Sequence, residues 1–205
     1  MYVGPPIDDV AILGRLPAAY RTLLAQANGY VAYAGGLHVR GACLSPEWHS
    51  LRAAWDGPRA IHRLFPAVSD SDVPFAEDAL GDQFLVRNDI VHRLSAETGE
   101  LESLGVDLAT FDMSVRADPV GYLSLGPLEQ FRAEGGALDP GQLLNVYPPF
   151  CVDAGGGERS FRAIPAADRI GFLASFAAQI RALPDGAAIR IEVKQQCAAI
   201  TWRCG

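Results

Sequence analysis

The sequence lacks an apolar run long enough to cross a membrane, and it lacks a leader of the secretory type. The opening residues, MYVGPPIDDV, have neither the basic start nor the hydrophobic stretch of a signal peptide. Cysteine is also scarce, and no C-x-x-C pair occurs among Cys43, Cys151, Cys197 and Cys204. This spacing excludes a disulfide scaffold and a cysteine zinc site, and it fits free thiols in a reducing compartment. We therefore expect a cytoplasmic protein without a membrane segment.

Positive charge is in short supply as well. The chain has 17 Lys and Arg residues against 24 Asp and Glu residues, which gives a formal net charge of -7. Nucleic-acid binding needs a basic patch, so neither DNA nor RNA is expected as a partner. A basic protein partner is favoured, because complementary charge speeds encounter. The alternative is that mild acidity only keeps the protein in solution.

The common catalytic and cofactor motifs are missing too. No G-x-S-x-G or G-x-G-x-x-G pattern occurs, and the triple glycine at 155–157 is not followed by the lysine of a phosphate-binding loop. The histidines have neither H-x-x-x-H spacing nor a neighbouring cysteine: His38, His49, His62 and His92. The sequence therefore predicts no enzyme, no metal centre and no cofactor.

What the sequence does contain is a core and a clear hairpin. Apolar residues make up 49% of the 205 positions, which is enough for a buried core. The stretch FAEDALGDQFLVRNDIVHRL, residues 75–94, predicts strands at 83–86 and 90–94 joined by a turn at 87–89, after an acidic lead-in at 77–82. A hairpin alone is marginal, so we place it in the middle of a sheet that flanking helices cover.

Periodicity and turn residues predict the other elements. Acidic residues suit a helix start at Asp8 and Asp9, and a hairpin is expected within 30–43. Helices are predicted at 16–27, 46–55 (capped by Ser45), 107–115, 119–134 (broken near Pro127) and 166–183. Strands are predicted at 64–68, 100–104, 142–152, 161–164 and 189–193, the last extending into 195–205.

Three motifs resemble the SUKH superfamily, also called Smi/Knr-like. Residues 16–30, LPAAYRTLLAQANGY, are similar to its opening helix and turn, L-P-x-x-Y-x-x-L-L-x-x-x-N-G. Residues 33–41 resemble its first hairpin, and residues 75–102 resemble its F-A-x-D-x-x-G-D-x-F strand pair, followed by a helix like that at 106–113. The likeness spans roughly residues 7–132 in all, and it departs from the family at Tyr30, where a second glycine is expected.

The resemblance implies an α+β fold, with an antiparallel or mixed sheet and helices on its outer side. It implies a SUKH domain at 1–138 and a C-terminal helix–strand extension at 139–205 packed on the same domain. Bacterial members are mostly immunity proteins that neutralise toxins, often nucleases, by binding them, whereas fungal members are scaffold-like regulators of cell-wall synthesis. No catalytic residues come with the family.

The expected function is therefore a non-catalytic cytoplasmic immunity protein, monomeric or homodimeric, that binds a cognate toxin such as a basic nuclease. One alternative is a scaffold or regulatory module with a housekeeping partner. The other is a small enzyme that uses the acidic residues with His92.

Acidic side chains with one aromatic residue are the expected partner contacts. Charge-rich loops are often only solvated surface, and this one lacks the calcium spacing D-x-D-x-D-G. Trp48 and Trp55 are weighed as aromatic anchors, but a core position is favoured for both. The predicted contacts are Asp70, Asp72, Glu77, Asp78, Asp82 and Tyr33.

Overall fold

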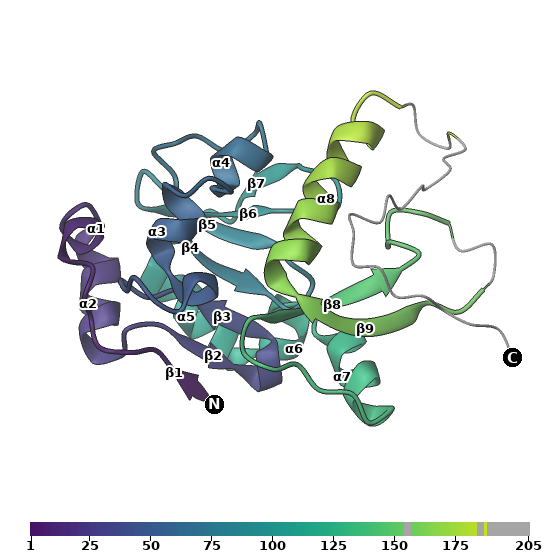
Figure 1. Ribbon diagram of the computed structural model, residues 1–205, viewed down its shortest axis with the longest axis horizontal. Helices are drawn as coiled ribbons and strands as arrows, with labels where there is room; N and C mark the ends of the chain where they lie inside the picture. The colour runs from purple at the N-terminus through teal and green to yellow at the C-terminus, as the bar shows by residue number, and fades with distance from the viewer. Residues whose placement is uncertain (154–156, 184–186, 188–205) are drawn as a thin grey trace, which may run out of the picture.

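A seven-stranded antiparallel sheet forms the centre of the molecule in the computed structural model, which describes residues 1–153, 157–183 and 187 (Figure 1). The strand order follows the chain from β1 to β7, so every strand pairs with its neighbour in sequence. The strands are β1 (Tyr2–Val3), β2 (Tyr30–Ala32), β3 (Leu37–Val39), β4 (Val73–Asp78), β5 (Gln83–Arg87), β6 (Ile90–Leu94) and β7 (Leu101–Ser103).

Helices pack against this sheet, and a separate two-stranded sheet lies beside it (Figure 1). The α-helices are α1 (Val10–Gly14), α2 (Ala18–Gln26), α3 (Leu51–Trp55), α4 (Ile61–Leu64), α5 (Leu108–Ala117), α6 (Pro119–Tyr122), α7 (Gly126–Ala133) and α8 (Ala166–Ile180). Short 3-10 turns are η1 (Tyr33–Gly35) and η2 (Glu47–His49), and the small sheet pairs β8 (Gln142–Tyr147) with β9 (Ser160–Pro165). The α+β class is therefore confirmed.

The sheet is buried on both faces. Successive side chains of a strand point to opposite faces, and β5 shows this alternation within the core. Phe84 and Val86 belong to a hydrophobic cluster shared with α2, α5 and α7. Leu85 belongs to a second cluster, shared with α4 and α8. Antiparallel sheets usually leave one face to water, so the second helical layer explains why the central strands are buried along almost their whole length.

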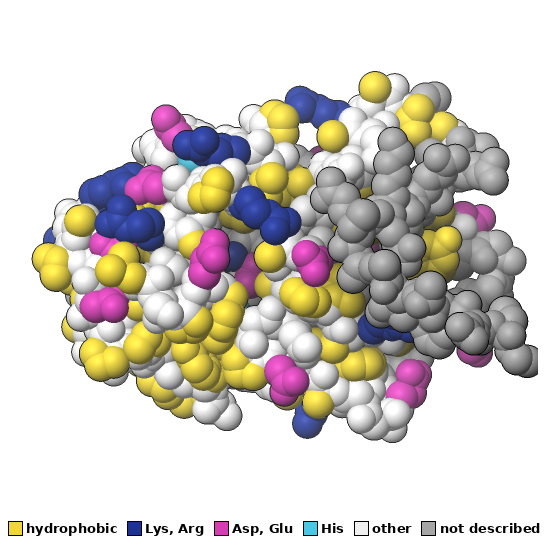
Figure 2. Space-filling model, viewed as in Figure 1, with side chains coloured by type: hydrophobic (Ala, Val, Ile, Leu, Met, Phe, Trp, Pro, Cys, Tyr) yellow, Lys and Arg dark blue, Asp and Glu magenta, His cyan; other side chains and the backbone are white. Residues whose placement is uncertain are grey.

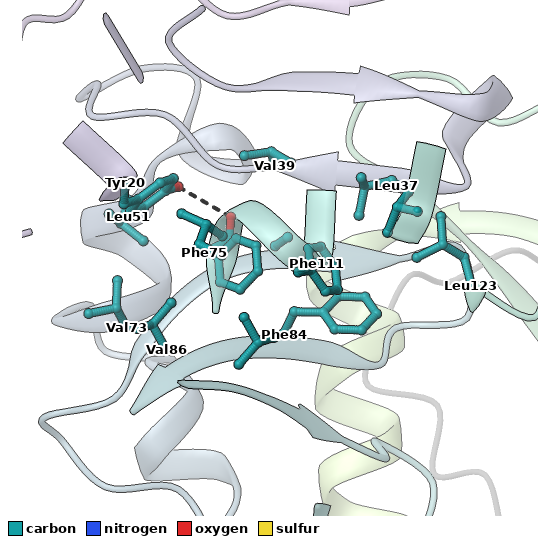
Figure 3. Close-up of a cluster of buried hydrophobic side chains, with 14 of the residues drawn as sticks. Tyr20, Leu37, Val39, Leu51, Val73, Phe75, Phe84, Val86, Phe111 and Leu123 are labelled. Carbon is teal, nitrogen blue, oxygen red and sulfur yellow. Dashed lines mark hydrogen bonds between the residues drawn. The ribbon is translucent and has the colours of Figure 1, made fainter. Parts of the chain in front are cut away.

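Aromatic rings fill the first cluster (Figure 3). The ring centroids of Phe84 and Phe111 lie 4.9 Å apart, and those of Phe75 and Phe111 lie 5.4 Å apart in an edge-to-face arrangement. The buried Tyr20 hydroxyl, on α2, donates to the carbonyl of Arg40 at 2.5 Å and lies 3.2 Å from the carbonyl of Phe75. The helix is thereby tied to the backbone of the central strand β4.

The C-terminal segment packs on the sheet through α8 and β8. Ile170 and Leu173 of α8 join the second cluster with Leu143 of β8. The backbone N–H of Leu144 donates to the carbonyl of Ala79 at 2.8 Å, which links the small sheet to the turn after β4. A division of the chain near residue 138 stays a prediction.

Most predicted elements occur in the structure. The hairpin of β5 and β6, the hairpin of β2 and β3, the edge strand β7, the helices α2, α5 and α8, and the strands β8 and β9 are all present. Asp9 caps α1 by accepting a hydrogen bond from the N–H of Ile12 at 3.0 Å. The predicted helix at 119–134 is divided into α6 and α7, as the Gly126–Pro127 break indicated.

The acidic lead-in predicted at 77–82 is wrong for its first two residues, because Glu77 and Asp78 end β4, the central strand, whereas residues 79–82 form the turn before β5. Acidic residues are depleted in strands, which favoured a loop in that position. Here Glu77 and Asp78 are both buried, and their carboxylates find partners inside the protein. Tertiary contacts therefore override the local preference.

Two further predictions were wrong in detail. The predicted strand at 64–68 is instead the end of α4 and a turn, in which the N–H of Phe65 bonds to the carbonyl of Ile61 and the N–H of Val68 bonds to the carbonyl of Phe65. The predicted helix at 46–55 is shorter and begins after η2, so its cap is Ser50 rather than Ser45. The strand predicted at 189–193, its extension through 195–205, Cys197 and Cys204 lie outside the described residues, as do residues 155–156 of the triple glycine. Among the residues described, no helix is long and apolar enough to span a membrane.

Candidate functional site

The predicted acidic contacts do not form one exposed surface. Asp72, Glu77 and Asp78 are almost fully buried, and the side chain of Asp82 is 13% exposed. Asp70 is exposed, in the loop before β4. Figure 2 shows acidic and basic side chains interspersed over the viewed face rather than gathered by sign. The prediction that all five carboxylates contact a partner is therefore wrong for Asp72, Glu77 and Asp78.

Asp72 has a structural role next to the hairpin turn. Its carboxylate accepts hydrogen bonds from Nε and Nη2 of Arg87, at 2.8 and 2.6 Å, and from the N–H of Ser69 at 2.7 Å. Asp70 itself contributes its backbone carbonyl, which accepts a 2.8 Å hydrogen bond from the indole N–H of Trp55. The 69–72 loop is therefore tied to α3 and β5.

Glu77, on β4, belongs to a series of buried, hydrogen-bonded polar side chains that continues through His38 of β3 to His49 of η2. One carboxylate oxygen accepts from Arg40 Nη2 at 2.7 Å, and the other lies 2.9 Å from His38 Nδ1. His38 Nε2 lies 2.9 Å from His49 Nδ1, and His49 Nε2 lies 2.9 Å from the carbonyl of Asn28. Because a carbonyl only accepts, His49 Nε2 carries the proton of that last bond.

Burial and neighbouring charge act against each other in this chain. Burial raises the pKa of Glu77, but Arg40 and His38 outweigh it and hold that pKa at about 2. Burial lowers the pKa of His38, and it lowers the pKa of His49 to about 4. The rings of Tyr2 and Trp48 pack against the histidines, with centroid distances of 5.1 to 5.3 Å. These hydrogen-bonded side chains are all buried, so they stabilise the interior and are not part of a surface that a partner could contact.

Asp78 builds the turn between β4 and β5. Its Oδ1 accepts from the backbone N–H groups of Leu80, Gly81 and Asp82, at 2.9, 3.0 and 3.0 Å. Gly81 has φ of +102°, a conformation that a residue with a Cβ rarely adopts. The motif A-E-D-A-L-G-D is therefore a turn-building motif, in which the side chain of Asp78 accepts hydrogen bonds from the N–H groups of the turn.

The second aspartate of the motif points towards a cavity. Oδ2 of Asp82 accepts from Nε and Nη2 of Arg93, at 2.9 and 2.7 Å, and its Oδ1 accepts from the N–H of Ala96 at 2.9 Å. The cavity has a volume of about 310 Å³. Its walls include Leu80, Asp82, Arg93, Glu97, Pro127 and Phe150.

Glu97, which also lines the cavity, faces a second guanidinium group, that of Arg169. Glu97 Oε2 accepts from the backbone N–H of Cys151 at 3.1 Å, while its Oε1 lies 3.6 Å from Arg169 Nη2. Arg169, on α8, is fully buried and donates to Asn145 Oδ1 at 3.0 Å and more weakly to the carbonyl of Leu80 at 3.4 Å. The charged cluster therefore joins the main sheet to the C-terminal segment.

Buried polar atoms without a hydrogen-bond partner gather at the same place. Four such side-chain atoms occur among the described residues, and three of them belong to this region: Asp78 Oδ2, Arg169 Nη2 and Arg159 Nε. Arg159 lines a neighbouring cavity of about 330 Å³ that shares Pro127 and Phe150 with the first. Because buried polar groups are nearly always paired, a cluster of exceptions calls for an explanation.

The remaining candidate residues have mixed positions. Tyr33 is 36% exposed and lies at the turn between β2 and β3, with φ of +51°. Trp55 is buried, with the guanidinium of Arg15 4.1 Å from its ring centroid, so the core position is confirmed for this tryptophan. His92 is half-buried on β6, and its Nδ1 lies 3.2 Å from the carbonyl of Ile90. Within the described ranges, no group of three or more His, Cys, Asp or Glu side chains could hold a metal ion.

Sequence reasoning found Asp82 but missed Glu97, Arg169 and Phe150. Arg169 precedes the apolar positions of a predicted amphipathic helix, where an arginine ordinarily faces water. Its complete burial depends on packing against residues about ninety positions earlier in the chain. No local pattern in the sequence marks such a contact.

Comparisons with known proteins do not assign the chain to a family. No family model matches it, and no curated protein matches it. Among solved structures, that of Atu4351 from Agrobacterium tumefaciens superposes with a TM-score of 0.49 over 84% of this chain and 81% of that one, at 13% sequence identity. We transfer no property across this distance.

Proposed function

We propose that this protein is a non-catalytic binding protein of the SUKH type, which neutralises a cognate bacterial toxin by holding it. The observation that carries the proposal is the ordered set of SUKH-like motifs over roughly residues 7–132. The proposal extends to a cytoplasmic location and to a partner that is a protein, such as a basic nuclease.

The positions of the motif residues support the resemblance. Leu16, Tyr20 and Leu24 are the buried residues that the opening motif contributes to the core. Asn28 closes that motif by donating to the carbonyl of Pro5 and accepting from the N–H of Ala42, both at 2.8 Å. Gly29 follows with φ of +75°. These residues determine the fold, so their likeness to the family is a likeness of architecture.

The partner surface in this proposal is the cavity region rather than the acidic loop. Phe150 is 42% exposed and Tyr147 is 52% exposed beside it, and aromatic side chains dominate the binding energy of many interfaces. The net charge of -7 favours a basic partner by attraction at long range.

The test is a co-expression experiment with the product of the neighbouring reading frame. We expect that product to be toxic when expressed alone, and we expect growth to return when this protein is co-expressed. Size-exclusion chromatography of the purified mixture should then show a stable complex of the two chains.

A harmless neighbour, or a toxic one that forms no complex, would contradict the immunity proposal. In that case affinity capture from the host lysate tests the alternative of a scaffold with a housekeeping partner. The variant Asp70→Asn should still rescue growth, because Asp70 is exposed in the 69–72 loop and does not line the cavity.

A further inference from the structure

The buried Glu77–His38–His49 series makes three close contacts, one after another. Oε1 of Glu77 lies 2.9 Å from Nδ1 of His38, and Nε2 of His38 lies 2.9 Å from Nδ1 of His49. Nε2 of His49 lies 2.9 Å from the backbone carbonyl of Asn28. Each contact needs one proton between its two heavy atoms to be a hydrogen bond. Two neutral imidazole rings carry only two protons, and an ionised carboxylate carries none, so the series is one proton short unless a ring is charged.

The two ends of the series determine where the protons lie. The carbonyl of Asn28 only accepts, so Nε2 of His49 donates to it, and the neutral ring of His49 accepts at Nδ1. Nε2 of His38 therefore has to donate to His49. At the other end, burial raises the pKa of Glu77, but Arg40 and His38 hold it at about 2, so this carboxylate is ionised and accepts. Nδ1 of His38 therefore has to donate as well.

We propose that His38 is an imidazolium ion in the folded protein at neutral pH and that its extra proton completes the series. Its two N–H groups donate in opposite directions, to Glu77 and to His49, and all three contacts are then hydrogen bonds. The site lies in the interior, so this proposal is independent of the toxin proposal.

The groups around His38 act on this charge in both directions. Burial lowers the pKa of His38, the hydrogen bond and the charge of Glu77 raise it, and the charge of Arg40 lowers it; burial is the largest of these effects. A neutral His38, however, would leave one of the three buried contacts without a proton, with two lone pairs facing each other. An unsatisfied buried polar group is costly, so the hydrogen bonds favour the charged ring against the effect of burial.

Aromatic rings complete the surroundings of the site. The ring centroid of Trp48 lies 5.1 Å from that of His38, within the range of cation–π attraction. The ring centroid of Tyr2 lies 5.2 Å from that of His49, and burial raises the pKa of the tyrosine above 10, so its hydroxyl is uncharged at neutral pH. Among the described residues, the charged groups that face the two histidines are therefore Glu77 and Arg40.

The series also connects the N-terminal strand β1 to the sheet. The side chain of Asn28 donates to the carbonyl of Pro5 at 2.8 Å, and the N–H of Gly4 donates to the carbonyl of Gly29 at 3.0 Å. A Cβ on Gly4 would lie 2.2 Å from Nε2 of His49, so the backbone passes directly over this ring. Loss of the extra proton opens one of the three contacts beneath the strand, which makes the connection depend on protonation.

Nitrogen NMR of the full-length protein with 15N-labelled histidine counts the protons directly, because protonated and bare ring nitrogens have well-separated shifts. We expect three protonated nitrogens among the four of His38 and His49 at pH 7, two on His38 and one on His49. The count should be the same at pH 5.5, since burial lowers the pKa of His49 to about 4. A count of two at pH 7 would mean that both rings are neutral and would overturn the proposal. A count of four at either pH would overturn it too.

Glu77→Gln is the matched variant. The amide oxygen can accept from Arg40 and Gln83 in place of the carboxylate, while the amide NH₂ donates to Nδ1 of His38. The amide then supplies the proton that the imidazolium supplied, so the count should fall from three to two with both rings neutral. A count that stays at three would overturn the assignment, because the charge on His38 would then not depend on the carboxylate.

Glu47→Gln is the control, because it removes a carboxylate from an exposed position of η2 near His49, and it should leave the count at three. The count in the wild type needs no variant, so the proposal stays testable if Glu77→Gln does not fold. Hydrogen exchange tests the link to β1. Once a rising pH has removed the extra proton of His38, the N–H of Gly4 should exchange faster than base catalysis alone accounts for. Exchange that follows base catalysis alone would overturn that link.

Discussion

At the scale of single residues, the turn between β4 and β5 shows how few atoms determine a local structure. One oxygen of Asp78 accepts hydrogen bonds from three consecutive N–H groups, of which the Gly81 N–H also lies 3.2 Å from the backbone carbonyl of Asp78. Gly81 supplies the positive φ that brings those groups together. The turn therefore depends on both residues, on Asp78 for the hydrogen bonds and on Gly81 for the backbone conformation.

Gly81→Ala is predicted to destabilise the protein by about 1–3 kcal/mol. A Cβ at this position would have an unfavourable φ and would lie 3.0 Å from Ile170 Cδ1 and 3.1 Å from Leu173 Cδ1. Chemical denaturation measures the free energy of unfolding. Gly126→Ala is the matched control, because a Cβ there meets no atom within 4 Å, and it should cost nothing measurable. Equal stability of the two variants would refute this account of the turn.

The buried histidines make stability depend on pH. Burial lowers the pKa of His49 from 6.5 to about 4. Between these two pH values the imidazole is protonated in the unfolded chain but neutral in the folded protein, so protonation favours unfolding. The free energy of unfolding should therefore be fully retained above pH 6.5 and fall as the pH drops towards 4. One proton contributes a slope of about 1.4 kcal/mol per pH unit.

His49→Gln tests this prediction. The difference in unfolding free energy between the two proteins, measured by denaturation from pH 7 to pH 4, cancels the contribution of other titrating groups. We expect that difference to shrink steadily as the pH is lowered, because only the wild type loses the His49 contribution. A difference that stays constant over this range would show that His49 titrates in the folded state as it does in the unfolded chain.

At the scale of elements, α8 contributes both apolar packing and a charged side chain to the sheet. Its buried residues Ile170, Leu173, Ala174 and Ala177 pack over the face that carries Leu85 and Leu94. The helix also brings Arg169 to the carboxylate cluster at the end of the sheet. One amphipathic helix thus supplies both a hydrophobic layer and a charge.

Leu173→Ala should lower the free energy of unfolding by about 2–5 kcal/mol, since the leucine is fully buried and its removal leaves a cavity. Ser175→Ala, on the exposed side of the same helix, should change it by less than about 0.5 kcal/mol. Thermal or chemical unfolding of the two variants side by side measures both effects. If Leu173→Ala lowered the free energy of unfolding only slightly, the packing of α8 on the sheet would contribute little to stability.

At the scale of the whole molecule, the sheet is the middle of three layers (Figure 1). The N-terminal helices and α5 to α7 contribute to one core, while α4 and α8 contribute to the other. The cavity cluster lies where the C-terminal segment meets the sheet, and it contains residues from both parts of the chain. The binding proposal therefore needs the complete chain.

A chain ending at residue 138 is predicted to fold poorly. Removing the rest would expose Leu85, Leu94, Ile61 and Phe65, which are now buried beneath α8 and β8. Apolar exposure of this size leads to association or loss of structure. Size-exclusion chromatography and circular dichroism of residues 1–138 test this, with the full chain as reference. A monomeric, cooperatively unfolding fragment would instead support the predicted domain boundary.

Sequence periodicity predicted elements whose structure is determined locally. The stripe of α2 and the pairing of β5 with β6 follow from the spacing of apolar residues and from turn chemistry. At the tight turn, Asn88 and Asp89 have φ of 51° and 62°, values that these residue types tolerate better than most. The cap of α3 was assigned to Ser45 instead of Ser50, and residues 64–68 were predicted as a strand. In both places a short turn occupies residues that the pattern assigned to a regular helix or strand.

The sequence alone determined the α+β class, most helices, the central hairpin and the lack of common catalytic motifs, because these depend on residue types at short spacing. Only the tertiary structure decided that Glu77 and Asp78 are buried and that Asp82 faces a cavity. Arg40 and Arg169 come to these carboxylates from distant parts of the chain, whereas Arg93 lies on β6, the strand that pairs with β5 directly after Asp82. Whether a carboxylate is exposed or buried depends on which cationic side chain the fold places next to it. A pattern of neighbouring residues in the sequence does not predict that pairing.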